Sequence, residues 1–383
     1  MLVKDCMRKF DTIDIRPIIP SPLTIGYRNK IEFSFGKYIS ERLNIHTDWN
    51  LGFHKQGEFS KIVDVDTCGL ITTQANTLYA YIKKLCQDVW LPTYDQKIHR
   101  GVLRHLVIRE GINTQQFLVH LVIADKAFDA DMQALWLQFK EMFYKDEYLK
   151  KTIDTMIVSY NNGLADIVRA TDTRTETWWG EGYIYEKLIF PKNDDTVEIN
   201  FRISPFSFFQ TNTIGAQQLF YHAVQLAWLV EGDILDLYCG TWSIGLSFLA
   251  MGIGENVIGV EVVSEAITDA WHNAKINGLE DQAMFFAGTA EKVFIDYPQL
   301  KEKMSTIGLI IVDPPREWLH KNVVDFLITM KKNYAAKIIY ISCNPITMAR
   351  DLEIMQQADI SCKVIQPVDM FPHTHHIEVI GLI

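Results

Sequence analysis

This sequence has little of what would indicate a membrane, secreted or metal-binding protein. No apolar run of about 18 residues, the length that crosses a bilayer, occurs in its 383 residues. The amino terminus MLVKDCMRKFD also lacks the apolar core of a signal peptide. The six cysteines are scattered without C-x-x-C spacing, which argues against a disulfide framework and against a zinc or iron–sulfur site. We therefore expect a cytoplasmic protein without a metal site or a membrane partner.

The composition is that of an ordinary globular protein, with 48% hydrophobic and 22% charged residues, and the length allows two or three domains. The net charge of −10 argues against a protein that coats nucleic acid non-specifically. The charge is uneven, however, because residues 1–110 contain 16 Lys and Arg against 12 Asp and Glu. Any polyanion-binding face is therefore expected in the amino-terminal half, although the same imbalance is common on a solvated surface.

The amino-terminal half has the pattern of a mixed α+β domain. Apolar and polar residues alternate from Leu23 to about residue 65, and the runs GVLRHLVIRE and QFLVHLVIAD, joined by GINTQ, predict a β-hairpin. Helical spacing predicts helices at 66–91 and 128–143, followed by a strand at 155–160 and a loop-rich run to 194. We take residues 1–195 as the first domain.

Basic and aromatic side chains are interleaved in this domain. Cations hold phosphates while rings stack on unpaired bases, so the pattern suits single-stranded RNA. An amphipathic sheet with one wet face gives the same pattern, and the residues alone favour neither interpretation. The basic residues concerned are Arg28, Lys30, His54, Lys55, Arg100, Arg104, His105 and Arg109.

After residue 200 the pattern changes to strands that alternate with helices. The runs GDILDLYCG, NVIGVEVV, IGLIIVDPPR and KIIYISC predict four strands, separated by helical segments. This alternation is typical of a Rossmann-like, doubly wound parallel sheet, which we assign to residues 196–383. Right-handed crossovers bring the carboxyl ends of its strands to one edge, where ligands bind.

Carboxylates recur at those strand ends. DLYCG at 236–240 follows the first strand, Glu261 ends the second and Asp313 follows the third. An acid there can accept hydrogen bonds from ribose hydroxyls, and because the motif is not G-x-G-x-x-G, S-adenosylmethionine fits better than NAD. Each acid alone is more often a helix cap or turn residue, so the argument depends on their recurrence.

Cys343 follows the buried run Ile338–Ile341, in the turn Ser342–Pro345 that precedes a helix. The adjacent helix amino terminus is expected to favour its thiolate form. A lone cysteine is usually a small buried hydrophobic residue, but this position at a strand end favours a reactive thiol.

Five ordered motifs resemble the RNA 5-methyluridine methyltransferase family, and the resemblance covers essentially the whole chain. The family uses S-adenosylmethionine to methylate C5 of a uridine in transfer or ribosomal RNA. The fold implied is an α/β methyltransferase domain with an amino-terminal α+β RNA-binding domain. The motifs are FQTN at 209–212, DLYCG at 236–240, DPPR at 313–316, SCNP at 342–345 with ARD at 349–351, and HIE at 376–378.

The resemblance also implies roles for individual residues. Cys343 resembles the family's nucleophile, which adds to C6 of the uracil, and Glu378 resembles its proton acceptor, which removes the C5 proton. Without the resemblance, Glu378 would be interpreted as a surface carboxylate on a final strand, IEVIGLI. The cofactor-binding residues implied are Gln210, Tyr238, Glu261 and Asp313. Because the uridine must leave its stack to reach the thiol, a uridine in an RNA loop is the expected substrate.

The chain departs from the family pattern at two positions. Trp242 and Trp318 stand where relatives have glycine, and Trp242 removes conformational freedom and space beside the cofactor. One hypothesis is that the gene uses UGA for glycine and is translated here with tryptophan. The alternative function is a catalytically impaired RNA-binding or RNA-folding protein on the same scaffold.

The remaining predictions concern the substrate and the assembly. The chain starts almost directly at the family's central domain, without the barrel or the iron–sulfur cysteines of many relatives, which favours a tRNA or a compact 23S rRNA substrate. Cytosine C5 methylation is disfavoured because no second paired cysteine motif accompanies Cys343. We expect a monomer.

Overall fold

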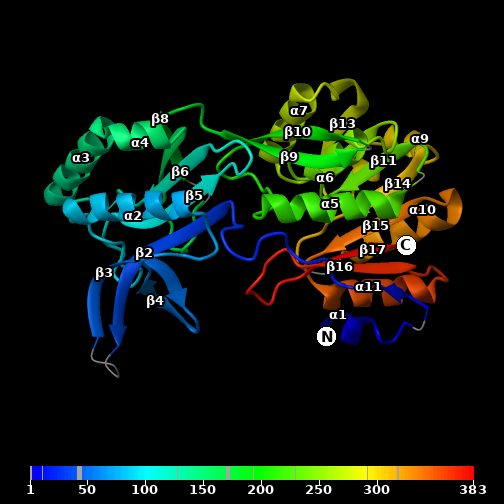
Figure 1. The fold of residues 1–383 in the computed structure, drawn as a ribbon, viewed down its shortest axis with the longest axis horizontal. Helices are drawn as coiled ribbons and strands as arrows, with labels where there is room; N and C mark the ends of the chain where they lie inside the picture. The colour runs from blue at the N-terminus through cyan, green and yellow to red at the C-terminus, as the bar shows by residue number, and fades with distance from the viewer. Residues whose placement is uncertain are drawn as a thin grey trace. The chain divides into compact units, whose positions relative to one another are not determined.

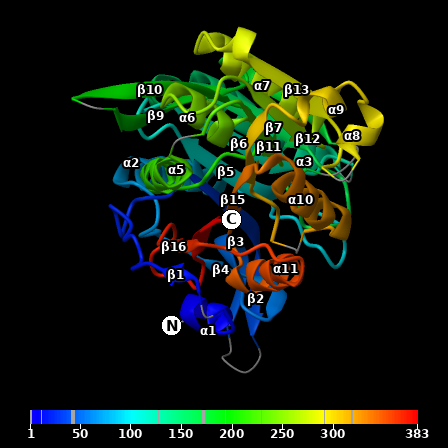
Figure 2. The ribbon, with the colours of Figure 1, turned by 90° about the vertical axis from the view of Figure 1, so that its right-hand side faces the viewer.

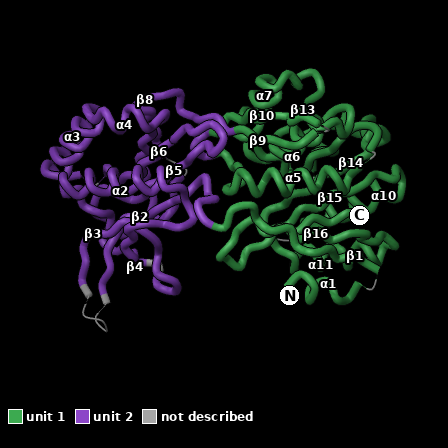
Figure 3. Tube along the Cα trace, in the orientation of Figure 1, with its two compact units in different colours: residues 1–24, 187–203, 207–383 green, residues 25–186, 204–206 purple. Residues whose placement is uncertain are grey.

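The computed structural model describes residues 2–10, 12–40, 45–126, 128–169, 173–192, 194–228, 230–290, 292–316 and 319–383. The chain forms two compact units (Figure 3). Unit 1 contains residues 1–24, 187–203 and 207–383, and unit 2 contains residues 25–186 and 204–206. This division differs from the predicted 1–195 and 196–383, because the first 24 residues group with the carboxyl-terminal unit.

Unit 1 is built on an eight-stranded sheet in the order β1-β16-β17-β15-β14-β11-β12-β13. The five strands from β11 to β15 are parallel to their neighbours in this group, as the alternating pattern predicted. The strands are β1 (Asp14–Ile15), β11 (Asp233–Leu237), β12 (Val257–Glu261), β13 (Ala283–Ala287), β14 (Ile307–Val312), β15 (Lys337–Ser342), β16 (Val364–Val368) and β17 (Glu378–Leu382).

The other edge of this sheet departs from the predicted parallel arrangement. Strand β17 runs antiparallel to both β15 and β16, and β1 pairs with β16 in parallel. The pairing of β1 with β16 joins the amino terminus to unit 1, which explains the revised domain boundary. Strands β1, β13 and β16 were not predicted; β1 has only two residues, which is too few for a period to show.

Helices cover both faces of the unit 1 sheet (Figures 1 and 2). Helices α5, α6 and α7 pack on one face, and α1, α10 and α11 pack on the other. A two-stranded ribbon of β9 and β10 contacts α6 and α7. The elements are α1 (Leu2–Met7), β9 (Ile184–Lys192), β10 (Asp195–Ile203), α5 (Thr213–Ala227), α6 (Ser243–Ala250), α7 (Ser264–Ile276), η2 (Glu280–Gln282), α8 (Val293–Asp296), α9 (Leu300–Lys303), α10 (Lys321–Tyr334) and α11 (Pro345–Gln357).

Unit 2 contains a seven-stranded sheet in the order β4-β3-β2-β5-β6-β7-β8, in which only β6 and β7 are parallel. The predicted hairpin is the antiparallel pair β5 and β6. The run before residue 194, predicted to be loop-rich, instead contains β8 and β9. The elements are β2 (Lys30–Ser40), β3 (Ile45–Lys55), β4 (Glu58–Asp64), α2 (Thr73–Asp88), β5 (Leu103–Glu110), β6 (Phe117–Ile123), α3 (Ala130–Lys145), α4 (Glu147–Thr152), β7 (Thr155–Tyr160) and β8 (Arg174–Trp179).

Helices α2 and α3 bury one face of this sheet under their apolar side chains, including Leu78, Ile82 and Phe139. Helix α2 starts later than predicted because the Thr72 hydroxyl caps it, accepting a hydrogen bond from the Ala75 N–H at 3.1 Å. None of the helices within the described ranges combines the length and apolarity that a membrane span requires.

Candidate functional site

The predicted residues at the strand ends of unit 1 come to one edge of the sheet. Because β11, β12, β14 and β15 are parallel, their carboxyl ends lie at the same edge. Tyr238 follows β11, Glu261 ends β12, Asp313 follows β14 and Cys343 follows β15. This edge is therefore the candidate active site.

Glu378 reaches the same edge by a different route. Strand β17 runs antiparallel to β15, and Val379 pairs with Ser342. The first residue of β17, Glu378, therefore lies beside the last residues of β15, next to Cys343. Glu378 is only 4% exposed, so the alternative interpretation as a surface carboxylate is wrong, although the predicted final strand is correct.

The loop between β11 and α6 is held by two carboxylates. Gly240 donates its N–H to Glu261 at 3.0 Å, and Gly245, in the first turn of α6, donates its N–H to Asp236 at 3.0 Å. Glu261 also accepts from the N–H of Val263 at 2.8 Å. The backbone of the loop curls through left-handed conformations at Tyr238 and Gly240. The acid at the end of β12 thus orients the loop that would face a nucleoside cofactor.

Asp236 itself lies beneath the loop and is completely buried. Burial is the main cause that raises its pKa to about 8; the carboxylates of Asp313 and Glu261 contribute to the rise, and the Gly245 N–H opposes it. One of its oxygens has no hydrogen-bond partner among the described residues. Asp236 therefore supports the loop from inside the core as a largely protonated acid at neutral pH.

Cys343 and Glu378 are both shifted toward their neutral forms. Burial raises the pKa of the Cys343 thiol, with a further contribution from Glu378, while Arg316 lowers it. Burial and Asp313 also raise the pKa of Glu378 well above its usual range, and Arg316 again opposes the shift. The expected stabilisation of the thiolate is therefore not seen, because burial and two acids outweigh the adjacent helix terminus.

The last acid of the site, Asp313, is also shifted. Its burial raises the pKa of the carboxyl to about 7. This places its titration near neutrality, so that its charge depends on what binds beside it.

The sequence identifies Arg316 only as the last residue of the DPPR motif, and the structure places its positive charge near Cys343 and Glu378. Its guanidinium lies 3.4 Å from the imidazole of His376, and its carbonyl accepts a hydrogen bond from the Asn344 side chain at 3.4 Å. Arg316 thereby links the loop after β14 to the turn that contains Cys343 and to the carboxyl-terminal tail. The signal that could have found it is its position three residues after Asp313.

The FQTN segment also adjoins the site. Gln210 is buried two residues before Asn212, which caps α5 by accepting from the Gly215 N–H at 2.8 Å. Asn212 also donates to the carbonyl of Met370 at 2.8 Å, and Thr241 of the β11–α6 loop donates to the carbonyl of Phe208 at 3.3 Å. The loop that contains Gln210 therefore lies between the β11–α6 loop and the carboxyl-terminal tail.

Asp351 of the ARD motif has a structural role. It accepts hydrogen bonds from the Tyr340 hydroxyl at 2.8 Å and from the Leu319 N–H at 3.2 Å. These bonds tie α11 to β15 and to the segment after the DPPR motif.

Trp242 has the backbone conformation that glycine would adopt. Its φ is +70°, in the left-handed region, at the amino terminus of α6. The indole is fully buried against Phe285 with ring centroids 4.8 Å apart, and its N–H has no partner among the described residues. The indole thus packs among buried side chains. Trp318 lies outside the described residues.

In unit 2, several of the predicted RNA-contacting residues are buried. Arg104 and His105 are each 1% exposed and Arg109 is 3% exposed. Arg104 donates hydrogen bonds to the carbonyls of Asn161, Gly163 and Ala165 at 2.6–2.7 Å. These three basic side chains therefore cannot hold RNA phosphates, which for them excludes the first of the two interpretations that the sequence left open.

A buried aspartate holds two of the predicted histidines. Asp166 lies 2.8 Å from His54 and 3.2 Å from His105. Burial opposes ionisation of Asp166, but hydrogen bonds from the two histidines hold the pKa of the carboxyl well below its usual range. Together with Arg104, this cluster fastens the segment 161–166 to the sheet.

The chain is similar to RNA methyltransferases over its whole length. A sequence model of the tRNA (Uracil-5-)-methyltransferase family matches residues 147–383. An uncharacterized RNA methyltransferase of Caldanaerobacter subterraneus subsp. tengcongensis is 32% identical over 100% of this chain and 77% of its own length. A second, from Oceanobacillus iheyensis, is 33% identical over 99% of this chain and 76% of its own length.

One solved structure is similar at both the sequence and the fold level. It is the Pyrococcus abyssi tRNA (uracil-54, C5)-methyltransferase in complex with S-adenosyl-L-homocysteine. It is 29% identical with a TM-score of 0.72, and the match covers 99% of this chain and 81% of that chain.

Proposed function

Because the chain belongs to the tRNA (uracil-5-)-methyltransferase family and is an S-adenosylmethionine-dependent RNA methyltransferase, we propose that it methylates C5 of one specific uridine in a tRNA or in 23S rRNA. The observation that supports this most is the antiparallel strand β17, which puts the buried Glu378 beside Cys343. A thiol and a carboxyl group at one strand edge are the nucleophile and base that this chemistry needs.

The cofactor has a suitable set of groups at the same edge. Glu261 ends β12 with backbone hydrogen bonds on both oxygens, which fix its orientation while lone pairs remain for ribose hydroxyls. We assign Gln210, Tyr238 and Asp313 to the same cofactor site, since they lie on the loops around it. S-adenosylmethionine supplies the methyl group when bound.

The proposed reaction uses Cys343 and Glu378 in turn. The partly exposed Cys343 thiol gives its proton to solvent, and the sulfur forms a bond to C6 of the uracil. The electrons of the C5–C6 double bond move toward C5 and the C4 carbonyl, which makes C5 the nucleophile. After C5 has gained the methyl group, Glu378 as carboxylate takes the C5 proton. The electrons of the C–H bond then restore the double bond as the C6–S bond breaks and releases Cys343.

Arg316 supports both ionisations in this scheme. It lowers the pKa of Cys343 and that of Glu378, against the burial that raises them. The shared cation thus offsets part of the burial effect that favours the neutral thiol and the neutral carboxyl group.

A methyl-transfer assay with isotope-labelled S-adenosylmethionine and unmodified bulk RNA tests the proposal. We expect labelled 5-methyluridine from the wild-type protein and none from Cys343→Ala. Cys6→Ala is the matched control, because Cys6 is also a partly exposed free cysteine, and it should retain full activity. Glu378→Gln should accumulate an RNA–protein adduct that survives denaturation, because the C5 proton is not removed.

Three results would contradict the proposal. Label that persists in Cys343→Ala would exclude this thiol as the nucleophile, and 5-methylcytidine would exclude uridine as the substrate. RNA binding without any methyl transfer by the folded wild-type protein would support the alternative of a catalytically impaired RNA-binding protein.

A further inference from the structure

Unit 2 has a groove lined by lysines on the β2–β3–β4 side of its sheet. The groove has a volume of about 520 Å³, and strands β2, β3 and β4 and the loop 94–97 line it. Four lysines but only two acids are among its lining residues, which leaves a net charge of +2 in a chain whose net charge is −10. The charged lining residues are Lys37, Lys55, Lys61, Lys97, Glu58 and Asp95.

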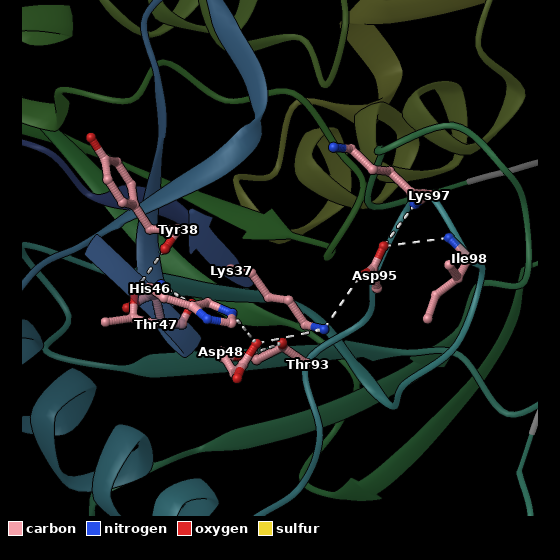
Figure 4. Close-up of polar contacts among 10 residues, drawn as sticks. Lys37, Tyr38, His46, Thr47, Asp48, Thr93, Asp95, Lys97 and Ile98 are labelled. Carbon is pink, nitrogen blue, oxygen red and sulfur yellow. Dashed lines mark hydrogen bonds and ion pairs between the residues drawn. The ribbon is translucent and has the colours of Figure 1, made fainter. Parts of the chain in front are cut away.

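Existing ion pairs hold this groove in shape. Asp95 binds the ammonium of Lys37 at 3.3 Å and accepts from the N–H groups of Lys97 and Ile98 at 2.9 and 3.4 Å (Figure 4). In Figure 4 the Lys97 ammonium points away from Asp95. The hydrogen bond to Asp95 therefore holds the backbone of Lys97, while its ammonium group does not pair with this carboxylate.

A second group of charges lies on the hairpin of β3 and β4. Glu58 forms ion pairs with both Lys55 and Lys61, and the two ammonium groups lie 5.7 and 6.0 Å from the centre of the Tyr38 ring. One carboxylate thus serves two lysines, which leaves one positive charge in excess beside an aromatic ring. A phosphate that approaches the pair completes its neutralisation.

We propose that this groove binds the phosphate backbone of the substrate RNA as a single strand. The proposal rests on the RNA substrate of the proposed function. Arg104, His105 and Arg109 are buried in the unit, whereas four lysines line this groove, so the groove is a place in unit 2 where positive charge can meet a polyanion. Lysines along a groove are suited to the phosphates of a single strand without sequence readout. The groove therefore contributes affinity and position, while the strand-edge site selects the uridine.

The test measures binding of a fluorescent, unstructured RNA oligonucleotide by anisotropy at several KCl concentrations. The protein carries Cys343→Ala and no cofactor is added, so binding is read without turnover. The groove variant is Lys61→Gln with Lys97→Gln. The control is Lys84→Gln with Lys145→Gln, which changes the net charge equally at two lysines that are 71% and 74% exposed on α2 and α3.

We expect the groove variant to bind more weakly and to lower the slope of log Kd against log salt by about 1.4, because each lost phosphate contact on a single strand removes about 0.7. The control should match the unsubstituted protein. Equal weakening in both variants, or no change in the groove variant, overturns the proposal.

Two competitors identify the ligand. Inorganic phosphate at the same ionic strength as KCl should displace the RNA no better than KCl does, and a poly-glutamate peptide should bind far more weakly than the RNA. The reverse of either result overturns the proposal.

The proposed reaction and the proposed RNA-binding groove can be refuted independently of each other. Wild-type protein that makes 5-methyluridine while the two lysine variants bind alike refutes the groove and leaves the reaction standing. RNA binding through the groove without any 5-methyluridine refutes the reaction and leaves the groove standing.

Discussion

Replacing Trp242 tests whether the β11–α6 loop requires glycine at this position. The perturbation is a pair of truncations, Trp242→Gly and Trp242→Ala, which remove the same indole and leave nearly the same cavity. Only the backbone preference differs between them. At a φ of +70° an alanine clashes through its Cβ, whereas glycine does not.

The expected magnitude follows from the conformation. A left-handed residue with a Cβ costs about 1–2 kcal/mol relative to glycine, so Trp242→Gly should be more stable than Trp242→Ala by about that amount. Trp136 provides the control, because it is also buried but lies inside α3. There the order reverses, since glycine in a helix interior is about 1 kcal/mol worse than alanine.

Calorimetric melting of the four variants measures these differences. For a unit of this size 1 kcal/mol corresponds to about 2–4 °C. Trp242→Gly should therefore melt about 2–8 °C above Trp242→Ala, and Trp136→Gly should melt below Trp136→Ala. An alanine at 242 that is as stable as glycine would refute the argument from backbone strain.

The same truncation bears on the recoding hypothesis. A fully buried Trp→Gly change normally costs about 3–5 kcal/mol, but here relief of strain and removal of an unpaired buried N–H, worth about 1–3 kcal/mol, offset much of the loss. Peptide sequencing of natively expressed protein should find glycine at 242. Tryptophan at 242 and 318 would refute recoding.

Two further predictions concern buried charges. Asp236→Asn should stabilise the protein relative to wild type by an amount that grows as the pH rises from about 4 to about 8. The pKa of Asp236 is about 8 in the folded protein and near 3.9 in the unfolded chain, so the wild-type protein loses stability across this pH range. Equal pH profiles of the two proteins in denaturant unfolding would contradict this prediction. Arg104→Met should destabilise unit 2 by about 3 kcal/mol or more, because three carbonyls lose a charged donor. The RNA affinity per folded molecule should not change. A combined melting and anisotropy experiment that finds stable protein with weakened RNA binding would contradict this prediction.

The local sequence pattern was enough to predict the main features of unit 1. The apolar run before Cys343 and the acids at the ends of β11, β12 and β14 indicate strand ends, because burial and termination are properties of a few consecutive residues. Parallel order followed from the alternation of strands and helices, and with it the shared edge of Tyr238, Glu261 and Asp313. The FQTN, DPPR and SCNP motifs then indicated the family.

Other features depend on contacts between distant segments, which no local period encodes. Glu378 meets Cys343 only because β17 inserts antiparallel beside β15, and the choice between a surface and a buried carboxylate was decided by that pairing. Arg104 had the sequence pattern of an RNA contact, yet the segment 161–165 returns over the sheet and takes up its guanidinium. The pKa shifts of Cys343 and Glu378 have the same origin, because burial and neighbouring charge are set by the whole fold. The sequence by itself therefore determined which residues stand at strand ends and which family the chain resembles, whereas the tertiary structure decided which of them meet, which are buried and which charges remain available to RNA.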